Sequence, residues 1–164
     1  MLDDNCIFCK IAAGEIPSET VYEDEQFRAI LDLGPASAGH TLILPKAHFK
    51  DVTEISDEYA ANVLKVAAKL GKAMKKGLGC EGFNLVQNNG EAAGQTVMHF
   101  HMHVIPRYAG GEDMVSWDPK PAKREELEKQ GAKLREALED KKEAFIKEGF
   151  AHHEKKLFIN KNKT

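Results

Sequence analysis

The 164-residue chain has no apolar run that approaches the roughly 20 residues needed to cross the hydrocarbon core of a bilayer. Its N-terminus, MLDDNCIFCK, is acidic where a secretory signal would be basic, and no long apolar segment follows it. No internal repeat is visible. We therefore expect one folded domain with no membrane partner and, by default, a cytoplasmic location.

The chain also lacks the excess of positive charge that nucleic-acid-binding surfaces usually carry. Its formal net charge is −3, so we expect no nucleic-acid partner. The charge is unevenly spread, because residues 1–119 hold 10 Lys or Arg against 17 Asp or Glu, whereas residues 120–164 hold 13 against 9. A basic C-terminal segment therefore follows an acidic body.

Cysteine is scarce, with 3 in the chain. In a reducing compartment the C-x-x-C pair of Cys6 and Cys9 indicates a metal-binding or redox-active site rather than a structural disulfide. No strand precedes the pair and no βαβ pattern surrounds it, which disfavours a thioredoxin-like motif. The pair is half of a zinc site at most, so two further ligands would be needed. Cys80 is interpreted as an ordinary buried or loop thiol.

Turn signals and alternating apolar residues predict an antiparallel sheet. Glu-Asp-Glu at residues 23–25 lies between two β-prone runs and predicts a hairpin turn. The run TLILP predicts a buried strand that ends at Pro45, and GFNLVQN predicts a further strand. Residues 88–96 then form a turn-rich loop.

Two stretches of the chain show helical periodicity instead of strand-like alternation. Between the N-cap Ser56 and Gly77 the apolar residues recur at helical spacing. That apolar stripe contains Ala60, Val63, Leu64, Ala67, Leu70 and Met74. A second, charged stretch predicts one amphipathic helix over residues 122–149, with a frayed end from about residue 151. Its apolar positions are Leu127, Leu134, Leu138 and Phe145.

The run VMHFHMHVIPR, residues 97–107, places three histidines at alternate positions. A period of two predicts a strand with an imidazole face, His99, His101 and His103, and a core face, Phe100, Met102 and Val104. A solvated polar face would normally carry Lys, Glu or Thr instead. The histidines therefore indicate either a catalytic metal cage or an imidazole nucleophile that attacks phosphorus, with its neighbours orienting it or serving the leaving group.

The surrounding residues favour the nucleophile. The strand contains no Asp or Glu, which a hydrolytic metal cage usually recruits. The loop NNGEAAGQT before it could bind phosphate oxygens through backbone amides, the Thr96 hydroxyl and the Gln95 amide. A phosphate site of this kind needs no basic patch.

At these residues the chain resembles the histidine triad (HIT) family. GQTVMHFHMHVIPR is similar to the family signature, and CIFCKIAAGEIPSETVYEDEQFRAILDLGPASAGHTLILPKAHF is similar to its N-terminal half, so the resemblance covers about residues 5–108. It implies an α+β fold with a roughly five-stranded antiparallel sheet and a long packing helix. The expected domains are a HIT domain over residues 1–110 and a C-terminal extension over 111–164, packed on the same domain or on a partner subunit.

The resemblance also implies roles for individual residues. His101 would attack the α-phosphorus of a nucleotide and form a nucleotidyl-histidine, His103 would contact the phosphate and assist the leaving group, and His40 would lie close to both. Asp32 would bind the ribose. Phosphate contacts would come from Asn88, Gly94, Gln95 and Thr96, and the base pocket from Ile7, Phe8, Ile11, Leu31 and Leu33.

A subset of the family, with its galactose-1-phosphate uridylyltransferase relatives, resembles this chain in its metal ligands. That likeness implies a structural zinc ion held by Cys6, Cys9, His48 and His99. No organic cofactor is expected. The zinc ion would fix the backbone that presents His101 rather than act as a Lewis acid.

The resulting expectation is a homodimeric hydrolase or transferase with a purine nucleotide substrate, either a nucleoside phosphoramidate or a dinucleoside polyphosphate. The sequence VIPR after the triad is more like the family members that cleave dinucleoside polyphosphates than like its phosphoramidases. The C-x-x-C pair departs from both groups, so the preference for a leaving group stays open. Two alternatives stay open: a non-catalytic nucleotide-binding or protein-interaction module, and a hydrolase with one metal ion bound by His99, His101 and His103.

Overall fold

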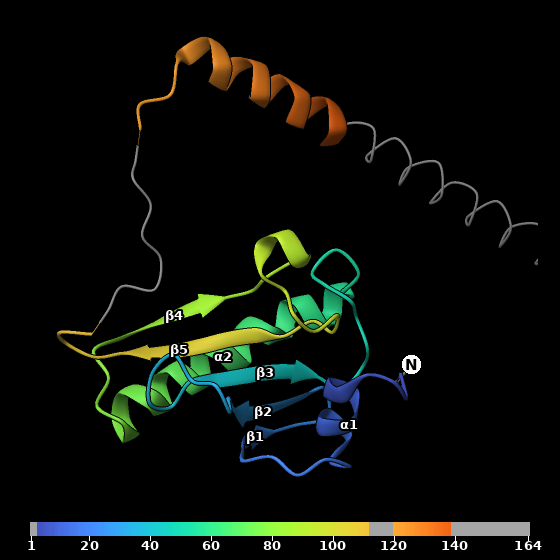
Figure 1. Cartoon of the computed structure of the whole chain (residues 1–164), viewed down its shortest axis with the longest axis vertical. Coiled ribbons are helices and arrows are strands. Elements are labelled where there is room, and N and C mark those ends of the chain that lie inside the picture. The colour runs from blue at the N-terminus through green and yellow to red at the C-terminus, as the bar shows by residue number, and fades with distance from the viewer. Residues whose placement is uncertain (1–2, 112–119, 139–164) are drawn as a thin grey trace, which may run out of the picture. The chain divides into compact units, whose positions relative to one another are not determined.

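The computed structural model describes residues 3–111 and 120–138, and they fall into two compact units, Met1–Asp113 and Met114–Thr164. The first unit is built on a five-stranded antiparallel sheet with the strand order β1-β2-β3-β5-β4 (Figure 1). Its strands are β1 (Thr20–Glu23), β2 (Phe27–Leu31), β3 (Thr41–Pro45), β4 (Gly82–Val86) and β5 (Met102–Arg107). The predicted α+β class, the hairpin and the strands predicted from TLILP and GFNLVQN are confirmed.

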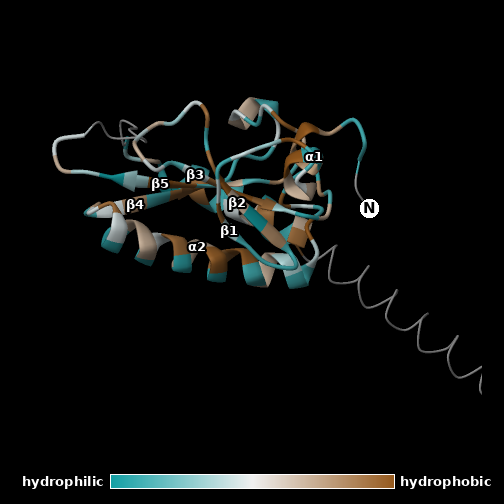
Figure 2. Ribbon diagram, turned by 90° about the horizontal axis from the view of Figure 1, so that it is seen from below, coloured by the Kyte–Doolittle hydropathy of each residue, from teal (hydrophilic) through white to brown (hydrophobic). Residues whose placement is uncertain are grey.

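Helix α2 (Asp57–Gly77) covers one face of this sheet, with its polar side turned outward (Figure 2). The Ser56 hydroxyl caps it by accepting a hydrogen bond from the Tyr59 backbone N–H. Its buried side chains pack against Phe27, Ile43 and Val104 from the sheet. The predicted helix is confirmed with one exception in its stripe: Leu64 is exposed.

The opposite face of the sheet carries a short helix that the sequence pattern did not predict, α1 (Ile7–Ala13). Its apolar side packs on a smaller cluster formed by Ala12, Ile30, Leu42 and Leu44, with Phe8 and Ile11 at the edge. Seven residues are too few for an isolated helix to be stable in water, so α1 depends on contacts outside itself.

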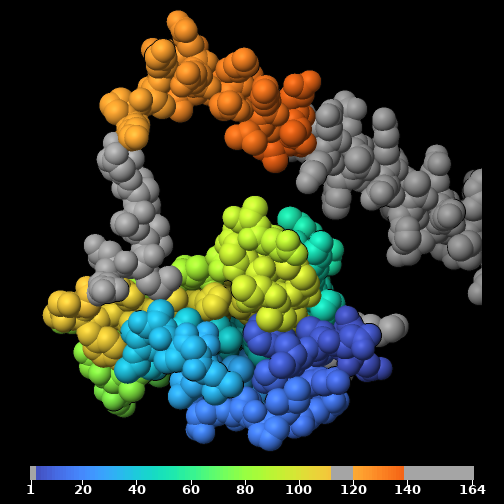
Figure 3. All heavy atoms as spheres, in the orientation of Figure 1, coloured from blue at the N-terminus to red at the C-terminus, as the bar shows by residue number. Residues whose placement is uncertain are grey.

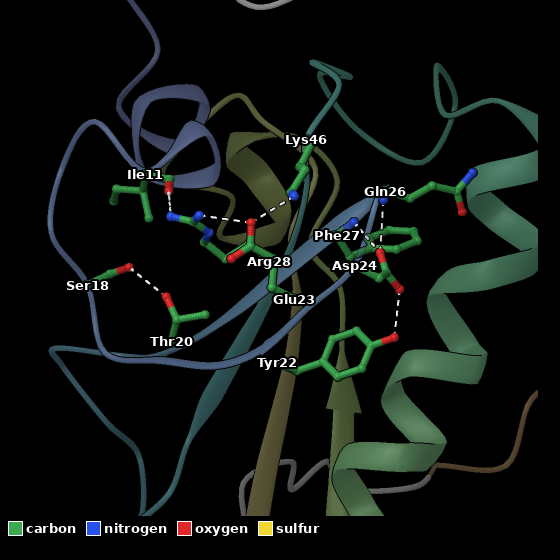
Figure 4. Close-up of polar contacts among 10 residues, drawn as sticks. All are labelled: Ile11, Ser18, Thr20, Tyr22, Glu23, Asp24, Gln26, Phe27, Arg28 and Lys46. Carbon is green, nitrogen blue, oxygen red and sulfur yellow. Dashed lines mark hydrogen bonds and ion pairs between the residues drawn. The ribbon is translucent and has the colours of Figure 1, made fainter.

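One of those contacts is Arg28, which holds the C-terminal turn of α1 (Figure 4). Its Nη1 donates to the Ile11 carbonyl oxygen at 3.1 Å, and its Nη2 donates to Glu23, which also pairs with Lys46. A cation at the C-terminus of a helix also complements the helix dipole. The sheet thereby anchors one end of α1.

The strand that carries the histidines is shorter than predicted. Strand β5 begins at Met102, so His99 and His101 lie in irregular chain before it. The Pro45 carbonyl at the end of β3 accepts a hydrogen bond from the His99 side chain, at 3.0 Å, rather than from a backbone N–H of β5. This side-chain hydrogen bond therefore replaces the backbone hydrogen bond that a longer β5 would make to Pro45.

In the second unit, residues 124–138 are helical, and Arg124 pairs with Glu128 one turn later. Its leucines Leu127, Leu134 and Leu138 are each more than half exposed. The predicted continuation to residue 149, with Phe145, lies outside the described residues. That this extension packs on the domain or on a partner subunit stays a prediction. Among the described residues, no helix combines the length and the hydropathy that crossing a membrane requires.

Candidate functional site

The metal-ligating side chains predicted from the sequence converge where α1 begins. The ligand atoms of Cys6, Cys9, His48 and His99 all lie within 4.8 Å of one another, and we call this group the Cys-His cluster. His99 Nδ1 is 3.5 Å from Cys6 Sγ and 3.4 Å from Cys9 Sγ. His48 Nδ1 is 3.3 Å from Cys9 Sγ. Two thiols and two imidazoles at these separations form the donor set of a closed, four-coordinate metal site.

Hydrogen bonding outside the cluster prepares His99 to be a ligand. Because His99 Nε2 donates to the Pro45 carbonyl oxygen, the neutral ring presents the lone pair of Nδ1 to the sulfur atoms. Burial lowers the pKa of His99 to about 4, so the ring stays neutral near pH 7. Burial also raises the pKa of the Cys9 thiol, so a metal ion would displace a proton when it binds.

His101 is buried, and its backbone neighbour fixes which ring nitrogen is free. Its Nδ1 lies 2.7 Å from the His99 carbonyl oxygen, which can only accept, so Nδ1 carries the proton. The lone pair of the neutral ring is therefore on Nε2. The ring of Phe8 meets the His101 ring edge-on, with the centroids 5.1 Å apart, and restricts its rotation.

His103 belongs to a second group, Asp32, His40 and His103, which we call the histidine relay. The Ala36 backbone N–H donates to His40 Nδ1 at 3.1 Å, so neutral His40 carries its proton on Nε2. That N–H donates to His103 Nδ1 at 2.9 Å. Neutral His103 consequently carries its own proton on Nε2 and can donate it. The Asp32 carboxylate lies 3.6 Å from His40 Nε2.

Burial keeps both rings of the relay neutral. It is the main cause that lowers the pKa of His103 to about 4, and the neighbouring rings His101 and His40 add to the shift. Burial likewise lowers the pKa of His40, against the opposing attraction of Asp32. At pH 7 the relay therefore offers a hydrogen-bond donor without a fixed positive charge.

The three histidines thus have three different surroundings. Within the described part of the chain, His99 joins the two cysteines and His103 joins Asp32, while His101 belongs to neither group of potential ligands. This arrangement does not support one metal ion held by all three.

The loop before the histidines is shaped largely by Gln95, one of the predicted phosphate contacts. The Gln95 side chain is buried: its Oε1 accepts from the Gly90 N–H at 2.8 Å, and its Nε2 donates to the carbonyl oxygens of Lys50 and Val97. Gly94 adopts a positive φ of 84° beside Asn88. Thr96 is exposed, so its hydroxyl is open to a ligand.

The predicted base-pocket residues are not all brought together. Phe8 and Ile11 lie on the face of the sheet that carries His101, whereas Ile7 is half exposed at the start of α1. Leu31 lies on the α2 side of the sheet, where it lines a cavity of about 390 Å³ with Leu70 and Met74. Leu33 is fully exposed. The structure therefore does not place Leu31 and Leu33 with the other members.

Two residues that the sequence reasoning missed fill their place, Ile30 and Leu42. Both pack with Phe8 and Ile11. Leu42 stands opposite His103 in the β3–β5 register. The sequence could have identified Ile30, because side chains two residues apart in a strand point to the same face and Ile30 lies two residues before Asp32.

Comparison with known proteins agrees with this geometry. The HIT domain matches residues 13–110. The chain is 49% identical over 109 residues to Protein hit of Bacillus subtilis, covering 66% of this chain and 75% of the relative. It is 40% identical over 134 residues to an adenosine 5′-monophosphoramidase of Schizosaccharomyces pombe, covering 79% and 96% respectively.

Solved structures show the same fold. SMU.412c from Streptococcus mutans matches with a TM-score of 0.79 at 38% identity, covering 83% of this chain and 87% of that one. A zinc-bound histidine triad family protein from Mycobacterium smegmatis matches with a TM-score of 0.64 at 41% identity, covering 74% and 86%. A matched domain that spans more than half of the sequence, together with these relatives, shows that the chain belongs to the HIT family.

Proposed function

We propose that this protein hydrolyses purine nucleotides at the α-phosphate through a covalent nucleotidyl-His101 intermediate. The observation that carries the proposal is the fixed tautomer of two adjacent rings. His101 presents a lone pair on Nε2, and His103 presents an N–H on Nε2, with the ring centroids 5.0 Å apart. A nucleophile and a donor held side by side suit attack on a phosphoryl group.

In the first step the Nε2 lone pair of His101 attacks phosphorus, a P–N bond forms, and the bond to the leaving group breaks. The leaving atom takes the bonding electron pair, and an amine leaving group also takes a proton from solvent. The His103 N–H stabilises the charge that develops on the phosphoryl oxygens and the leaving atom. The His99 carbonyl oxygen stabilises the positively charged His101 ring by accepting a hydrogen bond from its Nδ1–H. In the second step water attacks phosphorus, a P–O bond forms, the P–N electron pair returns to Nε2, and the proton lost by the attacking water passes to solvent.

The remaining residues position the nucleotide. Asp32 would accept hydrogen bonds from the ribose hydroxyls, and the Thr96 hydroxyl with loop amides would bind phosphate oxygens. Phe8, Ile11 and their neighbours Ile30 and Leu42 would contact the base. The relative named adenosine 5′-monophosphoramidase supports a nucleoside phosphoramidate as the substrate; a dinucleoside polyphosphate is the competing class.

We further propose that the Cys-His cluster holds a structural zinc ion. Its donor set and spacing fit zinc, and the similar protein from Mycobacterium smegmatis is described as zinc-bound. Four protein ligands would leave no open position for water. Its contribution would be to fix the chain around His99, whose carbonyl sets the tautomer of His101.

A homodimer is part of the same proposal. Strand β4 is at one edge of the sheet, and Leu85 on it and Leu64 on α2 are exposed. Pairing of β4 with its copy would satisfy the backbone groups of the edge and join the two sheets. Light scattering that gave the mass of a monomer at micromolar concentration would contradict it.

Trapping of the intermediate tests the function. The zinc-loaded protein is mixed with adenosine 5′-phosphoramidate or diadenosine tri- or tetraphosphate, quenched without acid within milliseconds, and analysed by intact mass. We expect an added adenylyl group in the wild-type protein and none in His101→Ala, which should bind AMP but turn over at least roughly 10³-fold more slowly. A His101→Ala variant with more than a few per cent of wild-type rate would refute the nucleophile assignment. Nucleotide binding without turnover of any substrate would favour the non-catalytic module.

A further inference from the structure

Strand β2 presents Arg28 to α1 on the face of the sheet that carries the proposed site. Side chains two residues apart in a strand point to the same face, so Arg28 shares its face with Ile30 and with Asp32 directly after the strand. Asp32 is the proposed ribose contact, and Ile30 is a proposed base contact. Arg28 completes this row at the end where β2 meets the last turn of α1.

The contact made by Arg28 falls on the backbone of another proposed base contact, Ile11. Arg28 Nη1 donates to the Ile11 carbonyl oxygen at 3.1 Å, and the same oxygen accepts from the Gly14 N–H at 3.0 Å. The Ile11 side chain packs, with that of Phe8, against the apolar cluster that includes Ile30. The guanidinium therefore fixes the position of the last turn of α1 over the strands that form the pocket.

The neighbours of the guanidinium leave it room and hold it in place. Gly14, which ends α1, has a φ of 83°, and a Cβ at this position would lie 2.9 Å from Arg28 Nη1. On the other side, Arg28 Nη2 donates to Glu23 at 2.9 Å, and Glu23 also pairs with Lys46 at 2.8 Å (Figure 4). Two different partners thus restrict both terminal nitrogens of the arginine.

Stability alone is a poor explanation for an arginine at this position. Its side chain is 15% exposed, and its Nε is buried without a hydrogen-bond partner among the described residues. A buried donor without a partner lowers stability. The ion pair with Glu23 gains little, because the Glu23 side chain is exposed and solvent screens its charge. What Arg28 contributes in particular is the position of α1.

The two ends of α1 serve different parts of the site. The first turn contains Phe8, whose ring centroid lies 5.1 Å from that of His101, and Cys9 of the Cys-His cluster. This end adjoins the loop before the histidines, as Figure 3 shows in deep blue and yellow-green, and residues of both line one cavity. The last turn contains Ile11 and is held by Arg28. A shift of the last turn should therefore weaken base binding and spare the nucleophile.

We propose that Arg28 is a positioning residue for recognition of the purine base. It acts through the backbone of Ile11, whose side chain it holds at the depth at which the pocket fits the base. The proposal rests on the proposed function, because it deepens the assignment of the base pocket. It also assigns a role to Gly14, which allows the guanidinium to approach the helix.

Arg28→Met tests this role, because methionine keeps part of the apolar length of arginine but donates no hydrogen bond. In the zinc-loaded full-length protein we expect the Kd of AMP, measured by calorimetry, to rise about 10-fold. The KM for adenosine 5′-phosphoramidate should rise by a similar factor while kcat changes by less than about 2-fold. Ribose 5-phosphate, which lacks the base, should bind wild type and variant equally in NMR titrations.

Two further variants of the same network sharpen the test. Arg28→Lys can still donate to the Ile11 carbonyl oxygen but cannot bond to Glu23 at the same time, so it should raise the Kd of AMP by about 3-fold only. Lys46→Met is the matched control, because it removes the other cation that pairs with Glu23 and leaves the bond from Arg28 to Ile11. It should bind both ligands as wild type does, and zinc content should be the same in all variants.

The proposal is overturned if Arg28→Met binds AMP as tightly as Lys46→Met does. It is also overturned if the affinities for AMP and ribose 5-phosphate fall by the same factor, or if kcat falls as far as kcat/KM, since either result would indicate a general loss of structure. If Arg28→Met is too unstable to assay, Arg28→Lys takes its place, and an unchanged affinity for AMP overturns the proposal.

Failure of the proposed function gives a different result. If the wild-type protein binds AMP but cleaves no nucleotide, the proposed function alone has failed, and the affinities for AMP and ribose 5-phosphate still decide the role of Arg28. If the wild-type protein binds no nucleotide, the proposed function and the role of Arg28 fail together.

Discussion

The Cys-His cluster and the histidine relay both use imidazole side chains, but the cluster offers a ring nitrogen as a metal ligand and the relay offers one as a hydrogen-bond donor. In the cluster, the Pro45 carbonyl oxygen accepts a hydrogen bond from His99 Nε2–H, so the lone pair of the neutral ring is on Nδ1 and faces sulfur. In the relay, His40 donates to His103 Nδ1 and leaves Nε2 as a donor. His101 lies between them, with its tautomer set from the cluster side and its donor partner on the relay side. The second nitrogen of each ring therefore decides its chemistry.

Removal of the metal site should have the largest effect on this comparison. Cys9→Ser, or chelation of the wild-type protein, removes a ligand that ties α1 to residues far along the chain. We expect zinc content to fall from about one equivalent per chain to below a third, and Tm to fall by on the order of 10 °C. Affinity for AMP, measured by calorimetry, should weaken by at least about 10-fold because Phe8 and Ile11 lie on α1.

The matched control for this prediction is Cys80→Ser, which alters the buried thiol outside the cluster. It can lower Tm through lost packing, but it should leave zinc content and AMP affinity unchanged. Wild-type protein that holds less than a third of an equivalent of zinc, and whose Tm does not respond to chelation, would rule out the metal site.

On the relay side, His40→Leu should lower kcat with less effect on zinc content or Tm than Cys9→Ser. It removes the donor to His103 Nδ1, so the proton of neutral His103 is no longer confined to Nε2. We expect kcat to fall roughly 10- to 100-fold. His40→Gln can still donate an amide N–H to His103 and should recover part of the loss. If the two variants are equally slow, His40 does not act by setting the tautomer of His103.

The smallest expected effect is the contribution of His103 to the pH dependence of the free energy of unfolding. The pKa of His103 is about 4 in the folded protein, below the value of about 6.5 of an exposed ring. Between these two values the unfolded chain binds a proton that the folded protein does not, so the free energy of unfolding should decrease as pH falls from 6.5 to 4. Denaturant titrations of chelated protein should show a shallower decrease for His103→Asn. An identical pH profile for the two proteins would show that His103 makes no such contribution.

The sequence predicted much of the fold because its signals are local. The stripe and cap of α2, the turn at residues 23–25 and the Pro45 terminus are all contained within short segments. The ligand set came from the family resemblance, and the structure brings the side chains of Cys6, Cys9, His48 and His99 together.

The errors arose where tertiary contacts override a local period. The spacing of the histidines suggested one continuous strand, but the His99 side chain bonds to Pro45 and β5 starts three residues later. Leu31 was assigned to the pocket by resemblance, although the alternation of β2 turns it toward α2. Helix α1 has only 7 residues, too few to show an amphipathic period.

Because α1 is pinned at its first turn by the Cys-His cluster and at its last by Arg28, its formation depends on partners that are distant in sequence. Cys6 and Cys9 are 39 to 93 residues away from the histidines they meet. Strands β3 and β5 must pair before His48 and His99 can face the sulfur atoms. The cluster can therefore be completed only after the sheet has closed, so the proposed zinc ion would bind late in folding, to chains in which the contacts of α1 have already formed.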